Sequence, residues 1–160
     1  MENILITGGA GFIGAHLSRA LLKDGHNVVV ADDFTLGSRE NVADCLENPN
    51  FTLVEQDVTD TDQLVALMEK HHIERIYHLA ANSDIQKSAK YPGIDYDKTF
   101  NTTYSVVEAM RRTGCKKLFF ASTSAVYGDK AGVNMTENMG GLAPISYYGG
   151  AKLASEAFIS

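Results

Sequence analysis

A short apolar run that opens directly into a cluster of glycines is the feature of this sequence that most restricts its fold. Residues 3–7 read Asn-Ile-Leu-Ile-Thr, and Gly8, Gly9, Gly11 and Gly14 follow at once, where a helical pattern begins. These glycines fit both G-x-G-x-x-G and G-x-x-G-x-x-G. Between a strand and a helix, missing Cβ atoms let a pyrophosphate approach the backbone, and the helix N-terminus attracts its charge. The stretch therefore predicts a dinucleotide site rather than an ordinary turn.

Strands and helices alternate along the rest of the chain. Short apolar runs between turn signals predict strands, and apolar residues three and four apart predict the helices between them. The predicted strands are residues 3–7, 27–31, 51–55, 75–79 and 117–121, and the predicted helices are residues 11–24, a short one ending at 45, one starting near 61, 98–112 and 147–159. A longer connection through Pro92 and Gly93 is predicted after the fourth strand. The alternation indicates one α/β domain with a doubly wound parallel sheet, of the Rossmann type, in three layers.

Composition narrows the class of protein. The chain has 160 residues, enough for one domain with a core, and its net charge of -6 comes without a Lys/Arg cluster, which argues against a nucleic-acid surface. No apolar run approaches the ~18 residues of a membrane-spanning helix, and no signal-peptide pattern precedes the first strand. Cys45 and Cys115 have no metal-ligand spacing, so we expect reduced thiols, a cytoplasmic protein and no metal site. His78 lies in an apolar run and is expected to be a hydrogen-bonded core residue.

Carboxylates follow the second and third predicted strands. Asp32 comes directly after residues 27–31, where a carboxylate can accept hydrogen bonds from both ribose hydroxyls of adenosine. It would also repel a 2′-phosphate, so NAD is favoured over NADP, although Arg39 is close enough in sequence to keep NADP open. Asp57 follows the third strand and can contact the adenine edge, but its spacing fits a solvated loop acid almost equally well.

A tyrosine and a lysine four residues apart indicate proton-transfer chemistry in the last predicted helix. Tyr148 and Lys152 share one helix face, so the ammonium can lie beside the phenol. A phenol with a pKa of ~10 is a poor base at neutral pH, and a cation ~4 Å away can stabilise the phenolate by about 4 kcal/mol. The hydroxyls of Ser122, Thr123 and Ser124, after the fifth strand, can hydrogen-bond a substrate oxygen or relay a proton.

Taken together, these residues resemble the extended short-chain dehydrogenase/reductases, the NAD-dependent sugar epimerase/dehydratase family. The resemblance covers essentially the whole chain in family order and is strongest to the branch of UDP-glucose 4-epimerases and related nucleotide-sugar epimerases. The stretches that carry it are residues 7–14, 32–33, 57–58, 78–81, Asn101, 122–128 and 148–152.

The resemblance implies a role for each matching residue. The cofactor-binding residues that it implies for NAD are Gly8, Gly11, Phe12, Ile13, Gly14, Asp32, Asp33, Asp57, Val58, Leu79, Ala80, Ala81, Asn101, Tyr148 and Lys152. The implied catalytic residues are Thr123, Tyr148 and Lys152, and the substrate would meet Thr123, Ser124 and Tyr148. The implied partner is a nucleotide sugar, with a UDP-sugar expected.

The reaction implied by the resemblance is epimerisation through a transient 4-keto sugar. Tyr148 would take the proton of the C4 hydroxyl while NAD accepts the C4 hydride, and the ketone would then be reduced on its other face. Dehydratases of the family usually carry an Asp-Glu pair after the threonine, where this chain has Ser124 and Ala125. Dehydration, reduction of a keto sugar and a non-catalytic NAD-binding module are the alternatives.

Length separates the chain from its family, whose members continue for about as much sequence again after the Tyr/Lys helix. That part supplies most of the sugar-nucleotide pocket, whereas this chain ends at Ser160. We therefore expect residues 1–160 to form a C-terminally truncated NAD-binding domain without the substrate domain, and to show little turnover alone. The resemblance also implies a homodimer in the full-length form. The identity of the sugar does not follow from this sequence.

Overall fold

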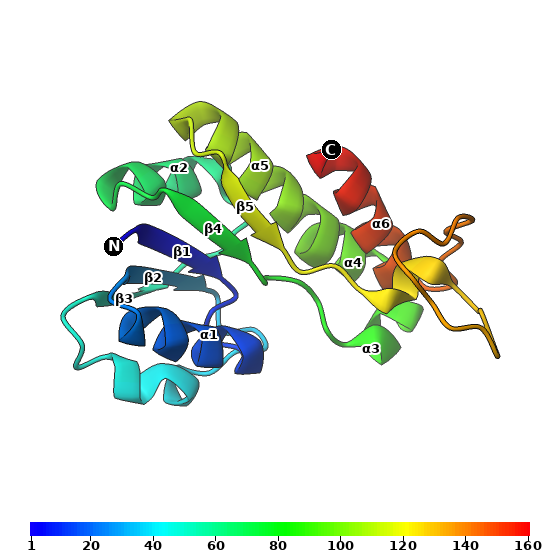
Figure 1. The fold of residues 1–160 in the computed structure, drawn as a ribbon, viewed down its shortest axis with the longest axis horizontal. Coiled ribbons are helices and arrows are strands. Elements are labelled where there is room, and N and C mark those ends of the chain that lie inside the picture. Colours follow the sequence, from blue (N-terminus) through cyan, green and yellow to red (C-terminus); the bar gives the residue numbers. More distant parts are fainter.

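A parallel sheet forms the centre of the structure, a computed structural model that describes the backbone of residues 1–160 and the side chains of residues 1–84 and 86–160. The strands are β1 (Asn3–Thr7), β2 (Asn27–Asp32), β3 (Phe51–Glu55), β4 (Arg75–His78) and β5 (Lys117–Phe120). They lie in the order β3-β2-β1-β4-β5, and every neighbouring pair is parallel (Figure 1). This order confirms the predicted doubly wound α/β fold. The chain crosses from one half of the sheet to the other after β3, so the switch point of the sheet lies between the neighbouring strands β1 and β4.

Helices connect successive strands as crossovers, and one further helix follows the last strand. They are α1 (Phe12–Lys23), α2 (Thr61–Lys70), α3 (Ile85–Lys90), α4 (Gly93–Asp95), α5 (Asn101–Thr113) and α6 (Tyr147–Ile159), with the 3-10 turns η1 (Arg39–Cys45) and η3 (Ser124–Tyr127) and the π-helical turn η2 (Tyr96–Phe100). The connection predicted around Pro92 contains two helices that the pattern did not indicate. The Asp84 carboxylate caps α3 by accepting from the Lys87 N–H at 2.9 Å, and Pro92 precedes the first turn of α4.

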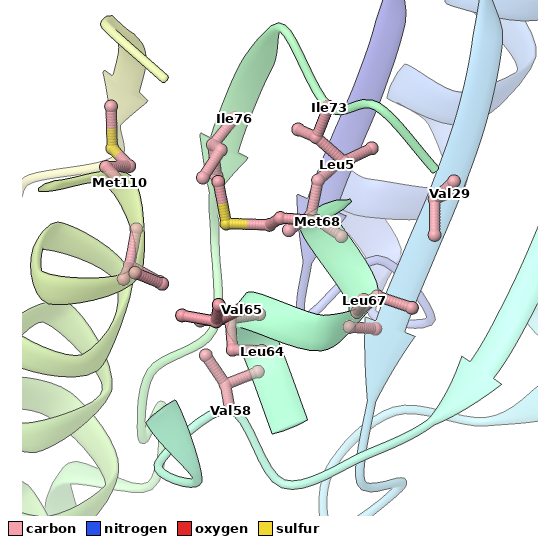
Figure 2. Close-up of a cluster of buried hydrophobic side chains, with 13 residues drawn as sticks. Leu5, Val29, Val58, Leu64, Val65, Leu67, Met68, Ile73, Ile76 and Met110 are labelled. Carbon is pink, nitrogen blue, oxygen red and sulfur yellow. The ribbon is translucent and has the colours of Figure 1, made fainter. Parts of the chain in front are cut away.

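Two buried clusters hold the layers together. Because side chains alternate along a strand, Ile4 and Ile6 join the cluster with α1 and η1, while Leu5 joins the cluster with α2 and α5. Figure 1 shows α1 on one face of the sheet and α2 and α5 on the other, and Figure 2 shows Leu5, Met68 and Ile76 in the second cluster. Each such side chain contributes roughly 1.5–3 kcal/mol by leaving water.

Helix α6 packs mainly on other helices, and its Lys152 meets the sheet at the end of β5. It contacts α3, α4, η2 and α5, and Figure 1 shows it beside α5, beyond the edge strand β5. The ring centroid of Phe158 lies 5.9 Å from that of Phe100 and 5.7 Å from that of Tyr104. These aromatic contacts set the position of α6, and its first turns thereby reach the carboxyl end of β5.

Candidate functional site

A cavity of about 590 Å³ opens at the carboxyl ends of the strands, across the switch between β1 and β4. Open α/β sheets bind ligands at this position, and the volume lies within the range of roughly 300–1,000 Å³ that is usual for small-molecule sites. The predicted cofactor residues that line it are Gly8, Gly11, Phe12, Ile13, Gly14, Asp32, Asp33, Asp57, Val58, Leu79, Ala80, Ala81, Tyr148 and Lys152.

The glycine turn forms the floor of the cavity. Gly8 has a positive φ of 67°, and a Cβ there would lie 2.7 Å from the Cα of Ala80. A Cβ at Gly14 would lie 2.5 Å from the Cα of Gly9, so these glycines are required by close packing of the turn itself. Gly11 differs, because its Cβ would meet only the Gly8 carbonyl oxygen, at 3.4 Å, and Gly11 faces the cavity. The sequence argument from ligand approach therefore applies best to Gly11.

The N-terminus of α1 supplies backbone donors at the same place. Gly11 is the N-cap residue and has no side chain to satisfy the first amides of the helix. The next residues, Phe12 and Ile13, are 78% and 66% exposed and line the cavity. Unpaired N–H groups and the positive end of the helix dipole make this turn suitable for an anion such as a pyrophosphate.

Asp32 is held in a fixed orientation beside the turn. One carboxylate oxygen accepts from the Ala10 N–H and the other from the Phe34 N–H, both at 2.9 Å. Burial raises the pKa of Asp32 above its ordinary value, although these two hydrogen bonds oppose the shift. Each oxygen keeps a further lone pair that could accept from a hydroxyl group. The side chain is 6% exposed and lines the cavity, so it is placed to bind a diol.

Arg39, whose position in the sequence left NADP possible as the cofactor, contacts Glu55 and Phe34. Its guanidinium forms an ion pair with Glu55 at 2.5 Å and lies 4.4 Å from the ring centroid of Phe34. Arg39 is absent from the described residues that line the cavity. The pairing with Glu55 leaves this arginine poorly placed to meet a 2′-phosphate.

Asp33 and Asp57 share one lysine. The ammonium of Lys98 lies 3.0 Å from a carboxylate oxygen of Asp33 and 2.8 Å from one of Asp57. Burial opposes ionisation of both acids, but hydrogen bonds, including those from Lys98, lower the pKa of each below its ordinary value. Burial likewise acts against the charge of Lys98, but the two carboxylates raise its pKa. The sequence analysis did not identify Lys98, because its partners lie 65 and 41 residues away along the chain.

Asn101, which the resemblance assigns to the cofactor, is not among the described residues that line the cavity. Among the described residues, the cavity is lined from this helical stretch by Ile94, Lys98 and Thr102, which are spaced four apart and so share one face. Asn101 precedes Thr102 and is turned about 100° away from it around the helix axis. The wall is completed by Asn82, whose amide nitrogen donates to Asp95 at 3.0 Å.

Tyr148 and Lys152 lie one turn apart on α6, and both line the cavity. Ser146 caps the helix by accepting from the Gly149 N–H at 3.0 Å. The ammonium of Lys152 donates to the Ala121 carbonyl oxygen at 2.6 Å and lies 4.5 Å from the ring centroid of Phe120. Burial lowers the pKa of Lys152 to about 8, although Glu156 opposes the shift.

The pKa of the Tyr148 phenol responds to burial and to a neighbouring hydroxyl. Burial raises the pKa of Tyr148, and a hydrogen bond with the Thr123 side chain partly offsets that rise. The ammonium of Lys152 donates to the Ala121 carbonyl oxygen at the end of β5. Thr123, predicted as the catalytic hydroxyl, is the side chain whose hydrogen bond lowers this pKa.

The three hydroxyls after β5 are divided between two cavities. Ser122 lines the main cavity, and its hydroxyl donates to the Glu156 carboxylate of α6. Thr123 and Ser124 line a neighbouring cavity of about 460 Å³, to which Ser122 also contributes. Ser122 thus stands at the boundary between the main cavity, which Tyr148 lines, and the neighbouring cavity, which holds the other two predicted substrate residues, Thr123 and Ser124. The contact between Ser122 and Glu156 is a second feature that sequence spacing did not indicate.

Comparisons with known proteins agree with this geometry. The family model for GDP-mannose 4,6 dehydratase matches residues 5–160. A UDP-glucose 4-epimerase of Mycolicibacterium smegmatis is 35% identical over 157 residues, covering 98% of this chain and 50% of that protein. The solved UDP-Glc/GlcNAc 4-epimerase of Campylobacter jejuni has a TM-score of 0.92 and 35% identity, covering 99% of this chain and 48% of the other.

A complex with NAD is among the similar structures. The UDP-glucose 4-epimerase of Thermus thermophilus, solved with NAD, has a TM-score of 0.89 and 31% identity, over 98% of this chain and 49% of the other. The chain therefore spans about half the length of each of these three proteins.

Proposed function

The chain belongs to the NAD-dependent sugar epimerase/dehydratase family of the extended short-chain dehydrogenase/reductases, and on this premise we propose that it binds NAD as the cofactor-binding half of a UDP-glucose 4-epimerase-like enzyme. The observation that carries the proposal is the placement of an uncapped helix N-terminus, a fixed carboxylate and a tyrosine–lysine pair around one cavity. These groups suit, in turn, a pyrophosphate, a ribose diol and a hydroxyl that loses its proton.

The residues present fit a dinucleotide. The first amides of α1 would hold the pyrophosphate next to Gly11, and Asp32 would accept hydrogen bonds from the adenosine ribose. Val58 would line the adenine end of the ligand, and the backbone between Leu79 and Ala81 would line the other end. The same carboxylate disfavours a 2′-phosphate, so the proposal is for NAD rather than NADP.

The catalytic roles that we propose are those implied by the family resemblance, and the contacts at the far end of the cavity support them. NAD, when bound, would supply a hydride acceptor and afterwards a hydride donor for sugar C4. Tyr148 would take the C4 hydroxyl proton and return it after the transient 4-keto sugar has turned to present its other face. Thr123, in hydrogen-bond contact with Tyr148, would relay the proton or bind the same oxygen. Lys152 would orient the tyrosine and hold positive charge nearby.

Epimerisation is favoured over the other reactions of the family. Ser124 and Ala125 stand where elimination would need carboxyl groups, so the proton donor and acceptor for dehydration are missing from that turn. A keto-sugar reductase or a non-catalytic NAD-binding module would use the same cofactor site. Thr123 in contact with Tyr148 argues for catalysis, since a binding module needs no base.

The partner that we propose is a UDP-sugar. It would be bound in part by residues of the kind that the relatives carry beyond the half that this chain matches. For this reason we expect little turnover from residues 1–160 alone, and homodimers only in a longer form. Among the described residues, none of the helices is both long enough and apolar enough to cross a bilayer. The free thiols of Cys45 and Cys115 fit a reducing compartment, and we propose the cytoplasm.

Calorimetric titration of this chain with NAD and then with NADP tests the cofactor assignment. We expect binding of NAD and at least tenfold weaker binding of NADP. Asp32→Asn should weaken the binding of NAD. It should also narrow the difference between the NAD and NADP affinities, because the repulsion of a 2′-phosphate is lost. Preference for NADP would overturn the role of Asp32 and shift the proposal toward a reductase. An assay of UDP-galactose epimerisation by the same chain should show almost no conversion.

A further inference from the structure

The wall of the cavity formed by β2 and β3 carries an excess of negative charge. Asp32, Asp33 and Asp57 follow one another along these strand ends, and all three line the cavity. An anionic pyrophosphate bound in the same cavity would be repelled by three uncompensated carboxylates. Asp32 keeps its charge for the ribose, so the charges of Asp33 and Asp57 must be balanced by another group if the ligand is to bind well.

Lys98 is in position to provide that balance. Its ammonium contacts both Asp33 and Asp57, and its stem lies on the helical stretch that forms the opposite wall. The other lysines that line the cavity are Lys87, on α3, and Lys152, whose ammonium is turned to Ala121 at the end of β5. Lys98 therefore joins the two walls at the strand ends that carry the carboxylates.

The backbone around Lys98 is unusual in the same place. Lys98 lies in the π-helical turn η2, between α4 and α5. Such turns are rare and are frequently found at functional sites. The ion pairs themselves add little to stability, because the three side chains are 36%, 30% and 46% exposed. We therefore expect these ion pairs to affect ligand binding rather than the stability of the fold.

From this geometry we propose that Lys98 is a determinant of cofactor affinity, which neutralises Asp33 and Asp57 and bridges the two walls so that the cavity accepts an anionic dinucleotide. The inference rests on the proposed NAD site and deepens it. Lys98 is a positioning residue that acts through two carboxylates, and no step of the reaction is assigned to it.

The test is NAD titration of this chain and of Lys98→Met at about 50 mM and about 500 mM salt. We expect the substitution to weaken NAD binding by about tenfold at low salt and by less at high salt, because screening reduces the repulsion. Lys98→Arg, which keeps the charge, should retain most of the affinity. Lys23→Met removes one lysine charge from an exposed site at the end of α1 and should bind like wild type.

A double-mutant cycle separates charge balance from a structural effect. In an Asp57→Asn background, Lys98→Met should weaken NAD binding by clearly less than tenfold, since one of the carboxylates that it balances is gone. Circular dichroism confirms the fold of each variant, and Lys98→Gln replaces Lys98→Met if the latter unfolds. Equal affinities of wild type and Lys98→Met, tighter binding by the variant, or the same loss in both backgrounds would each overturn the proposal. A wild-type chain that binds no NAD would instead overturn the cofactor assignment on which it rests.

Discussion

The ammonium of Lys152 donates a 2.6 Å hydrogen bond to the carbonyl oxygen of Ala121, and this bond ties α6 to the end of β5. The lysine is 2% exposed, so a charged group is held at a buried junction between a helix and the sheet. The bond accounts for two properties of the site. It holds the ammonium against the backbone at the end of β5, and it keeps the lysine where burial lowers its pKa to about 8.

Stability should therefore depend on pH through Lys152. The folded chain loses the Lys152 proton at a pH of about 8, whereas the unfolded chain keeps it until about 10.5, so the unfolded state binds more protons between these values. We expect the free energy of unfolding of wild type, relative to Lys152→Met, to rise by about 1 kcal/mol between pH 8 and pH 9. Urea unfolding of both proteins at these pH values measures it. Parallel changes in the two proteins would contradict the assignment.

His78 should make the fold sensitive to acid. It is fully buried, with Nδ1 2.6 Å from the Thr7 hydroxyl and Nε2 3.1 Å from the Thr103 hydroxyl, as expected of a core histidine. Burial, with a smaller effect of Lys152, lowers its pKa to about 3. Below about pH 6.5 His78 binds a proton in the unfolded chain but not in the folded chain. The free energy of unfolding should therefore fall by roughly 1 kcal/mol per pH unit as pH decreases.

Two variants isolate this acid effect. His78→Gln should lose stability less steeply between pH 6 and pH 4 than wild type, as measured by urea unfolding at each pH. His72→Gln, at an exposed histidine of the same chain, is the comparison for a histidine-to-glutamine change outside the core. If His78→Gln and wild type show the same slope, His78 does not titrate as the buried site requires.

Two glycines that differ only in their surroundings test the turn. A Cβ at Gly14 would lie 2.5 Å from the backbone of Gly9, so Gly14→Ala should cost about 1–3 kcal/mol of stability and weaken NAD binding. A Cβ at Gly150, inside α6, would meet no described atom within 4 Å. Gly150→Ala should therefore stabilise the chain by ~0.5–1 kcal/mol. Thermal unfolding measures both, and a neutral Gly14→Ala would show that the turn relaxes easily.

Removal of the Tyr148 hydroxyl should separate binding from chemistry. The phenol contacts Thr123 and none of the groups proposed to hold the pyrophosphate or the adenosine ribose. Tyr148→Phe should thus bind NAD within about twofold of wild type by calorimetry. In a longer protein that carries this segment and turns over a UDP-sugar, the same substitution should lower kcat by at least ~100-fold. Unchanged turnover there would remove Tyr148 from the mechanism.

The order of elements and much of the cavity lining could be predicted from the sequence, because each depends on neighbours along the chain. The glycine turn follows from residues 3–14, and strand ends bring Asp32 and Asp57 to one edge of the sheet once the strands are parallel. The helices α3 and α4 were missed because their start depends on capping by Asp84 and Pro92 in a stretch without a clear apolar period.

What the sequence determined by itself is local: the strand–turn–helix unit around Gly11, the carboxylate of Asp32 after its strand, and the spacing of Tyr148 and Lys152. Tertiary structure alone decided which group each charged side chain meets. Periodicity states which face of a helix a residue occupies but not what packs against that face. The contacts of Lys98 with Asp33 and Asp57, and of Lys152 with Ala121, therefore depend on how the helices pack against strands that are distant in sequence.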